Sequence, residues 1–210
     1  MEKGEVEVGV RNCEQRELAC GLPVRQRTSL TFQAKIAQLG ASLGFRIWLP
    51  QNERNRIVKR LPAACHPSVV TALPLNYDAE TQKTIEAIDV IWLQGRTIAR
   101  AFEVEHSTVI FSGLLRMADL LAMQPRTKIP LHIVAPTERR DQVRREITRP
   151  VFSVLEGGAM ARRCSFISYE AVDEILAQPN LSHMKETVIE DYEKYFDAAD
   201  ASPGTSRMRA

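Results

Sequence analysis

The residues from 87 to 107 constrain the fold of this chain more than any other segment. They read as two apolar strands joined by a Gln94-Gly95-Arg96 turn, and they carry acids where apolar residues are expected. Asp89 lies in the first strand, and Glu103 and Glu105 flank a valine in the second. An isolated charge in apolar surroundings is strongly unfavourable, so these acids need a partner. A cation that neutralises all three together would provide one.

The alternation of side chains along a strand predicts how the three acids are arranged. Glu103 and Glu105 share one face of their strand, about 7 Å apart along it. If the hairpin is symmetric about Gly95, Asp89 lies opposite Ala101 and diagonal to Glu103, on that same face. A turn centred between residues 95 and 96 would instead send Asp89 to the other face. The predicted cluster therefore depends on the register of the hairpin.

The same acids also fit a purely structural interpretation. Asp89 could cap a turn or pair with Arg100, and the two glutamates could pair with arginines from a neighbouring helix. The spacing of three acids on one face favours the cation site, but the sequence leaves both interpretations open.

Length and composition indicate one soluble globular domain. The chain has 210 residues, of which 44% are hydrophobic and 26% charged, which is typical of such proteins. We expect an N-terminal extension over residues 1–28, a domain over 29–197 and a disordered tail over 198–210, which is rich in small and polar residues. The net charge of +2 does not by itself indicate a nucleic-acid partner.

The cysteines and the apolar runs indicate a cellular location. Four scattered cysteines without a CxxC pair argue against a structural zinc site and a secreted disulfide framework. The first twenty residues are charged throughout, unlike a signal peptide. No apolar run approaches the ~20 residues of a membrane helix. We expect a reduced, cytoplasmic protein with no membrane partner.

The order of periodic segments predicts the fold class. A helix capped by Ser29 and ended by Gly44 precedes a strand over 45–49, and a long connection over 51–84 leads to the acid-bearing hairpin. We then expect a helix over 111–122, a strand over 131–135, a helix over 138–148, a strand over 164–168 and a helix over 169–177. This order predicts an α/β domain with a central sheet covered by helices on both faces.

This layout resembles the PD-(D/E)xK nuclease superfamily of restriction-endonuclease-like proteins. The resemblance lies in an αβββαβ core with an aspartate in the second strand and an acid-x-acid pair in the third, here an ExE variant. It runs from Ser29 to Ala135, and more loosely to Ala177. The runs LGFRIWLPQNER (residues 43–54) and FEVEHSTVIFSGLLRMADLL (residues 102–121) are also similar to stretches of bacterial and archaeal members. The resemblance implies a mixed central sheet flanked by helices.

The resemblance also implies roles for the acids. The motif's aspartate falls on Asp89 and its second acid on Glu103. The motif's lysine position falls on Glu105, which is a departure, as is Ile88 at the position of the motif's proline. Asp89 and Glu103 would hold Mg²⁺, for which Mn²⁺ would substitute, with the Val104 carbonyl as a further ligand. Glu105 would activate or position the attacking water, and Arg100 or Arg116 would supply the missing positive charge near the phosphate.

The function implied is a Mg²⁺-dependent endonuclease acting on double-stranded DNA, of restriction or phage-defence type. We expect a homodimer, working with a methyltransferase or another defence-system partner. One alternative is a catalytically inactive nuclease-fold subunit that binds DNA or a partner. Another is a glycosidase using a pair of carboxylates, but an aromatic content of 6% counts against a sugar site.

Three further features have two interpretations each. The stretch after the first strand, with Arg54, Arg56 and Lys59 as candidate DNA contacts, also fits an exposed basic loop. The arginine-rich segment 138–148 could follow a phosphate backbone, but its interleaved acids favour a salt-bridged, solvated face. Gln33, on the first helix, occupies a position where superfamily members carry an acid or glutamine near the metal, yet it starts on the polar flank of the helix.

Overall fold

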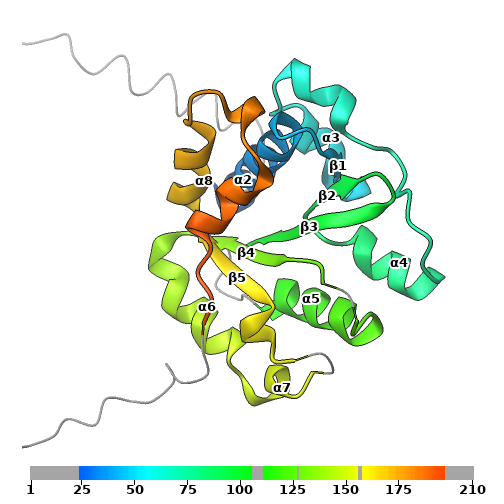
Figure 1. The fold of residues 1–210 in the computed structure, drawn as a ribbon, viewed down its shortest axis with the longest axis vertical. Coiled ribbons are helices and arrows are strands. Elements are labelled where there is room, and N and C mark those ends of the chain that lie inside the picture. Colours follow the sequence, from blue (N-terminus) through cyan, green and yellow to red (C-terminus); the bar gives the residue numbers. More distant parts are fainter. Residues whose placement is uncertain (1–23, 106–110, 127, 156–157, 197–210) are drawn as a thin grey trace, which may run out of the picture.

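A computed structural model describes residues 24–105, 111–126, 128–155 and 158–196. Its centre is a five-stranded sheet in the order β1-β2-β3-β4-β5 (Figure 1). The strands are β1 (Arg46–Trp48), β2 (Val90–Gln94), β3 (Thr97–Val104), β4 (Leu131–Ala135) and β5 (Cys164–Ser168). β2 runs antiparallel to β1 and to β3, whereas β3, β4 and β5 are parallel to one another. The predicted α/β class with a mixed central sheet is confirmed.

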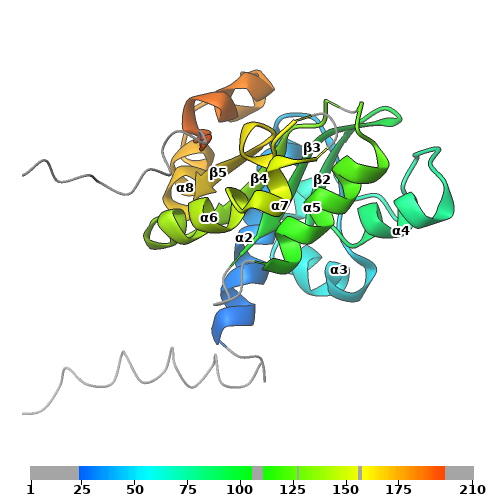
Figure 2. The ribbon, with the colours of Figure 1, turned by 90° about the horizontal axis from the view of Figure 1, so that it is seen from below.

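Helices cover both faces of this sheet (Figure 1). One layer contains α2 (Val24–Ser42), α3 (Gln51–Val58) and α8 (Tyr169–Leu176). The other contains α4 (Ala79–Glu86), α5 (Phe111–Met123), α6 (Arg140–Ile147) and α7 (Pro150–Ser153). Figure 2 looks onto α5, α6 and α7 with the sheet behind them. Short 3-10 helices complete the fold: η1 (Ala63–Ser68), η2 (Thr137–Arg139), η3 (Met160–Arg162), η4 (Leu181–His183) and η5 (Glu186–Tyr192).

The alternation of the strands divides the core into two halves. In β2, Val90 and Trp92 pack toward α2, while Ile91 and Leu93 pack toward α5. The indole N–H of Trp92 donates to the carbonyl of Ile36 in α2 at 3.2 Å. A Cβ atom at Gly40 would lie 2.4 Å from the Trp92 Nε1. A glycine within α2 therefore lets the helix approach the sheet closely.

Several predicted boundaries are wrong, each for a local reason. α2 begins at Val24, so Ser29 lies inside the helix and does not cap its start. The predicted connection over 51–84 contains α3, η1 and α4. These elements lack an apolar stripe that could reveal them, since α3 buries a single residue, Ile57. Pro150 opens α7 as well as closing the helix before it, which agrees with the preference of proline for a first helical turn.

Other predictions are confirmed or lie outside the described residues. The strands over 131–135 and 164–168 have the predicted bounds. The predicted tail over 198–210 lies outside the described residues, as do the first two cysteines and most of the predicted N-terminal extension. Cys65 and Cys164 are buried free thiols. Among the helices described, none combines the length and apolar character that crossing a bilayer requires.

Candidate active site

The register of the β2–β3 hairpin decides where the three acids point. Gln94 pairs with Thr97, so the turn contains two residues, Gly95 and Arg96. Such a turn is centred between residues 95 and 96, and by itself it would send Asp89 to the face away from Glu103. The predicted symmetry about Gly95, with Asp89 opposite Ala101, is wrong.

A β-bulge brings Asp89 back to the face of the sheet that carries Glu103. Leu93 pairs with Ile98, but Trp92 pairs with Arg100, so Ala99 is a surplus residue in β3. One extra residue shifts the remaining pairs by one position. Val90 then pairs with Phe102, and the same register carried back by one residue sets Asp89 opposite Glu103.

The three predicted acids meet next to α5, where β2 begins and β3 ends. Asp89 is half-buried just before β2, and its Oδ2 accepts the backbone N–H of Val104 at 2.8 Å. Glu103 is 1% exposed and Glu105 is 6% exposed. Glu105 Oε1 accepts the backbone N–H of Gly113 in α5 at 3.3 Å. The structure therefore brings together Asp89, Glu103 and Glu105.

Gly113 allows this close approach of α5 to the acids. A Cβ atom at Gly113 would lie 2.7 Å from Glu105 Oε1 and 3.0 Å from Glu103 Oε2. Real Cβ atoms essentially never show a contact under 3.0 Å, so a side chain at position 113 would force the Glu105 carboxylate or the helix to shift. A glycine is therefore required for the observed packing of the helix on both glutamates.

Arg116, one turn after Gly113 on α5, pairs with Glu103. Its Nε donates to Oε1 of Glu103 at 2.8 Å and its Nη2 to Oε2 at 2.5 Å. This two-pronged geometry is the strong form of an arginine–carboxylate pair. For Glu103, the structural interpretation with a neighbouring helix's arginine is thus what the structure shows. The alternative pairing of Asp89 with Arg100 is not formed.

The cluster still has more negative than positive charge. Burial is the main cause that raises the pKa values of these three acids, and the negative charges of neighbouring acids add to it. For Asp89 the neighbouring acid is Glu53. The pKa of Asp89 is raised to about 6 and that of Glu105 to about 7. Burial and the charge of Asp89 raise the pKa of Glu103 well above its usual range, although Arg116 opposes this. Acids of this kind take up a proton or a cation near neutral pH.

Two polar side chains from the helical layer of α2 and α3 lie close to Asp89. Gln33 of α2 is 2% exposed, so it is buried and not solvated. Its Nε2 donates to Oε2 of Glu53 in α3 at 3.4 Å, and the side chain lies near enough to Asp89 to lower the pKa of that acid. Sequence reasoning missed Glu53, because it stands among basic residues and only the fold brings α3 beside Asp89.

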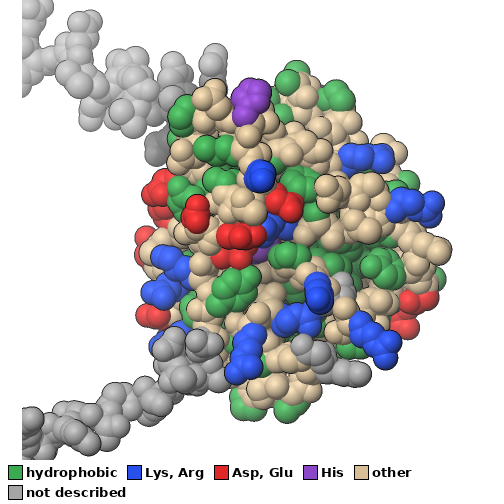
Figure 3. Space-filling view, in the orientation of Figure 1, with side chains coloured by type: hydrophobic (Ala, Val, Ile, Leu, Met, Phe, Trp, Pro, Cys, Tyr) green, Lys and Arg blue, Asp and Glu red, His purple; other side chains and the backbone are tan. Residues whose placement is uncertain are grey.

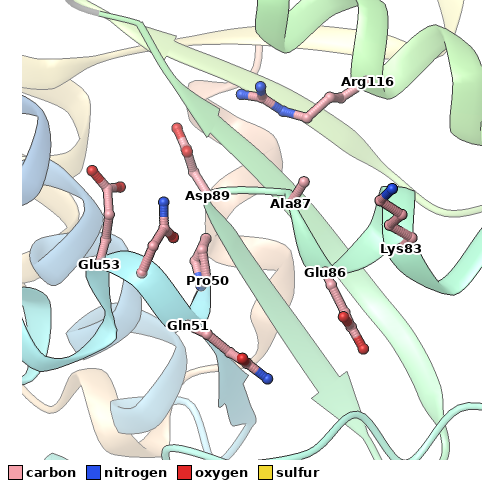
Figure 4. A pocket seen from close by; sticks show the side chains of 9 residues that line it. Pro50, Gln51, Glu53, Lys83, Glu86, Ala87, Asp89 and Arg116 are labelled. Atoms are coloured by element: carbon pink, nitrogen blue, oxygen red, sulfur yellow. The ribbon is translucent and has the colours of Figure 1, made fainter.

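Glu53, Asp89 and Arg116 line an open pocket of about 510 Å³. Its wall is formed by Pro50, Gln51, Asn52, Glu53, Lys83, Glu86, Ala87, Asp89 and Arg116. Figure 4 shows the carboxylates of Glu53 and Asp89 turned to the same side, with the guanidinium of Arg116 beyond Asp89. The side chains of Gln51 and Glu86 turn away from them.

The donor atoms suit a hard divalent cation in their chemistry, because carboxylate and amide oxygens are what Mg²⁺ and Mn²⁺ prefer. The Oε1 of Gln33 is buried and lacks a hydrogen-bond partner, as an unused oxygen ligand would. As they stand, however, the described residues contain no group of three acidic, histidine or cysteine side chains placed to hold a metal. Both oxygens of Glu103 are engaged by Arg116, so a cation at Glu103 would have to share these oxygens with Arg116 or displace it.

Arg100 does not belong to this cluster, which corrects its predicted roles. It is 4% exposed and its neighbours in β3 with the same orientation pack toward α2, away from Glu103. Its Nη1 donates to Oε1 of Glu193 at 2.7 Å and lies 3.3 Å from Nε2 of His132. Arg100 therefore joins the sheet to the C-terminal segment and is out of reach of a DNA backbone.

Of the other candidate DNA contacts, Arg54 and Arg56 lie on α3 and Lys59 follows it directly. Arg54 donates to the carbonyl of Leu49 through Nε and Nη2 and to that of Thr71 through Nη1, and it stacks on Trp48 at 4.5 Å. It therefore holds the loops around β1. Arg56 and Lys59 are exposed.

The arginine-rich segment around α6 has acids among its arginines. Arg149 Nε lies 2.7 Å from Glu146 Oε2, in keeping with the predicted salt-bridged face. Figure 3 shows Lys and Arg side chains spread over the half of this surface that includes α5–α7, with Asp and Glu side chains between and beside them.

Comparison with known proteins adds an independent finding. The family model for the C-terminal domain of the type II restriction enzyme NmeDI matches residues 13–196. A curated relative, the type II restriction enzyme NmeDI of Neisseria meningitidis serogroup C, is 30% identical over 157 residues. The match covers 71% of this chain and 42% of that relative, so the chain spans less than half of the relative's length. No solved structure matches.

Proposed function

The chain belongs to the family of type II restriction enzyme NmeDI C-terminal domains, and on this premise we propose that it is a metal-dependent endonuclease acting on double-stranded DNA. Its biological role would be restriction or defence against phage. The observation that carries the proposal is the register that sets Asp89 opposite Glu103, with Glu105 beside them, while Asp89 also lines an open pocket. This arrangement supports placement among PD-(D/E)xK nucleases of the ExE type.

Asp89 and Glu103 would hold Mg²⁺ or Mn²⁺ between them, and Val104 would contribute its carbonyl oxygen. The bound cation would stabilise the negative charge that develops on the phosphate and on the leaving oxygen. The backbone N–H of Val104 already fixes the orientation of Asp89. Asp89 is thus held in place by β3, the strand that carries Glu103.

Glu105 would accept the proton of the attacking water. A pKa of about 7 suits a general base that works near neutral pH. The backbone N–H of Gly113 binds one of its oxygens and leaves the other for water.

Arg116 would supply the positive charge that the motif's lysine provides elsewhere. In the structure it neutralises Glu103, and we infer that it turns to the scissile phosphate when a cation takes over the oxygens of Glu103. A guanidinium binds a phosphate with the same two-pronged geometry. Arg56 of α3 and Lys59 directly after this helix are exposed, and they would contact the DNA backbone.

We also propose the assembly. Cutting both strands of a duplex takes two active sites, which a homodimer provides. A restriction enzyme also requires protection of the host DNA, so a methyltransferase or another defence-system protein is the expected partner.

Digestion of unmodified bacteriophage DNA tests the proposal, because a phage genome offers many different sequences. Cleavage is expected with Mg²⁺ or Mn²⁺ and is abolished by EDTA. The variants Asp89→Asn and Glu103→Gln should lose cleavage, while Asp119→Asn, an exposed acid on α5, should cut like the wild type. Cleavage that persists in EDTA, or in Asp89→Asn, would refute the assignment.

The engagement of Glu103 by Arg116 favours a second candidate, a nuclease-fold subunit that binds DNA or a partner without cutting. The glutamate at the lysine position of the motif points the same way. This candidate predicts that the chain shifts duplex DNA in a gel and leaves it intact with either metal.

A further inference from the structure

Three chain segments meet at the carboxyl end of the parallel part of the sheet. Glu105 follows β3 directly, and its backbone N–H donates to the carbonyl of Val134 in β4 at 2.8 Å. Tyr169 follows β5, and its hydroxyl donates to the backbone carbonyl of Glu105 at 3.4 Å. The third segment is η2, which follows β4 and ends at Arg139. Because ligands of open α/β sheets bind at the carboxyl ends of the strands, side chains gathered here are candidates for substrate contacts.

Arg139 has a donor atom that the folded chain leaves unsatisfied. The side chain is half-buried, and its charge acts on both Glu105 and Tyr169, so its guanidinium lies near the proposed general base. Within the described residues, the Nη1 of Arg139 is buried without a hydrogen-bond partner. Among the ion pairs that these residues form, none includes Arg139. A buried donor left unpaired is costly and therefore calls for an explanation.

The backbone that carries Arg139 is held on both sides. Thr137 Oγ1 donates to Oε2 of Glu170 at 2.6 Å, which ties η2 to the first turn of α8. The backbone N–H of Arg139 donates to the carbonyl of Pro136 at 2.9 Å, and α6 begins at the next residue. A group that is already held in position loses less conformational freedom when it binds a ligand. Arg139 is therefore prepared to bind an anion.

Arg139 differs in this respect from Arg116, a second arginine whose charge acts on Glu105. Arg116 gives two donors to Glu103, whereas Arg139 has a donor to offer in the structure as it stands. The anion that a nuclease brings to this place is a DNA phosphate. A guanidinium binds a phosphate through two parallel hydrogen bonds, which fix both distance and orientation.

We propose that Arg139 binds a backbone phosphate next to the one that is cut, and so positions the DNA strand against Glu105. The inference rests on the proposed function, from which it takes DNA as the substrate, and it adds the turn after β4 to the DNA-binding surface. The structural alternative is that Arg139 only offsets the charge of the buried acids. Removal of Arg139 would then lower the free energy of unfolding and leave DNA binding unchanged.

The test is binding of a fluorescent DNA duplex to the full chain in EDTA, measured by anisotropy over a range of NaCl concentrations. Each phosphate contact contributes about 0.9 to the slope of log affinity against log salt concentration. Arg139→Gln should therefore weaken binding and reduce this slope by about one, while Arg139→Lys should retain the slope. Arg126→Gln is the matched control, because Arg126 is exposed in the turn before β4, and it should bind with the wild-type slope. Urea denaturation verifies that each variant is folded.

The outcomes separate this inference from the proposed function. An unchanged slope in folded Arg139→Gln overturns the phosphate contact, and metal-dependent cleavage by the wild type would still support the nuclease. A slope reduced in Arg139→Gln alone supports the phosphate contact even if the wild type cuts no phage DNA with either metal, a result that would refute the nuclease activity. An equal reduction in Arg126→Gln, or a wild type that binds no duplex, overturns the phosphate contact.

Discussion

Arg116 and Glu103 form a two-pronged ion pair in which every oxygen of the most buried acid is bonded to the guanidinium. Arg116 is 30% exposed by its side chain, so it has access to the pocket and room to turn. The pair places a basic residue where a metal would neutralise the same oxygens. We therefore expect Arg116 and a cation to compete for Glu103.

Removal of Arg116 should strengthen metal binding while it weakens the metal-free fold. In Arg116→Gln, Glu103 is left buried without its partner, which should cost about 1–3 kcal/mol of unfolding free energy. Added Mg²⁺ should then raise the melting temperature more than it does in the wild type, because nothing competes for Glu103. Scanning calorimetry with and without Mg²⁺ measures both effects. Arg140→Gln, an exposed arginine of α6, is the control, and an equal Mg²⁺ response in all three proteins would contradict the competition.

The pH dependence of stability has a defined sign. The pKa of Asp89 is raised to about 6 and that of Glu105 to about 7, whereas both are near 4 in an unfolded chain. The folded state binds these protons more tightly, so their contribution is complete below about pH 4 and is lost as the pH rises through 6 and 7. The metal-free protein should be more stable to urea at pH 5 than at pH 8, and Glu105→Gln should flatten this dependence. Greater stability at pH 8 would show that the acids are not buried together.

Divalent-cation binding should show the opposite dependence on pH. The ligands must lose their protons before a metal can bind, so the affinity for Mn²⁺ should increase from pH 6 to pH 8. Titration calorimetry in buffers of different ionisation enthalpy would detect the released protons. An affinity that stays constant over this range would argue against Asp89 as a ligand.

The glycine in the first turn of α5 should be intolerant of substitution. A methyl group at position 113 would lie 2.7 Å from Glu105 Oε1, so the buried Glu105 carboxylate or the helix would have to shift. We expect Gly113→Ala to lose about 1–3 kcal/mol of stability and most of the cleavage activity. Ser112→Ala, at an exposed neighbouring position, should change neither. Urea denaturation and plasmid cleavage measure the two quantities, and a stable, active Gly113→Ala would refute the packing.

The ion pair on the opposite side of the sheet should be structural and not catalytic. Glu193→Gln removes the charge that balances buried Arg100, and breaking a buried pair costs about 3–5 kcal/mol. We expect faster proteolysis of the segment around η5, while the cleavage rate of protein that remains folded is unchanged. Glu190→Gln is a milder control, because Glu190 is 59% exposed. A lower specific activity of folded Glu193→Gln would reopen a functional role for Arg100.

The acids of the site could be predicted from the sequence because they violate a local rule. A charge inside an apolar strand is visible without any tertiary information, and Asp89, Glu103 and Glu105 all carry that signal. The bounds of β4 and β5 were predictable too, since each is a short apolar run that is buried on both faces.

The remaining parts of the site depend on contacts between distant segments. The bulge at Ala99 is a property of the pairing between β2 and β3, and no residue type in the sequence marks it. Glu53 lies on a helix that buries a single side chain, so the sequence there has no repeating apolar pattern that predicts a helix. Arg100 has its partner 93 positions further along the chain, in the C-terminal segment, and local patterns could not distinguish it from a surface arginine.

The surplus alanine in the third strand limits how this protein can change its length. Loss or gain of one residue between the turn and the acids would preserve a well-paired hairpin but carry Asp89 into the opposite layer, beneath the first helix. We therefore expect the β2–β3 hairpin to keep Asp89 on the face of Glu103 only if residues are inserted or deleted in pairs, or if the facing strand changes its length as well.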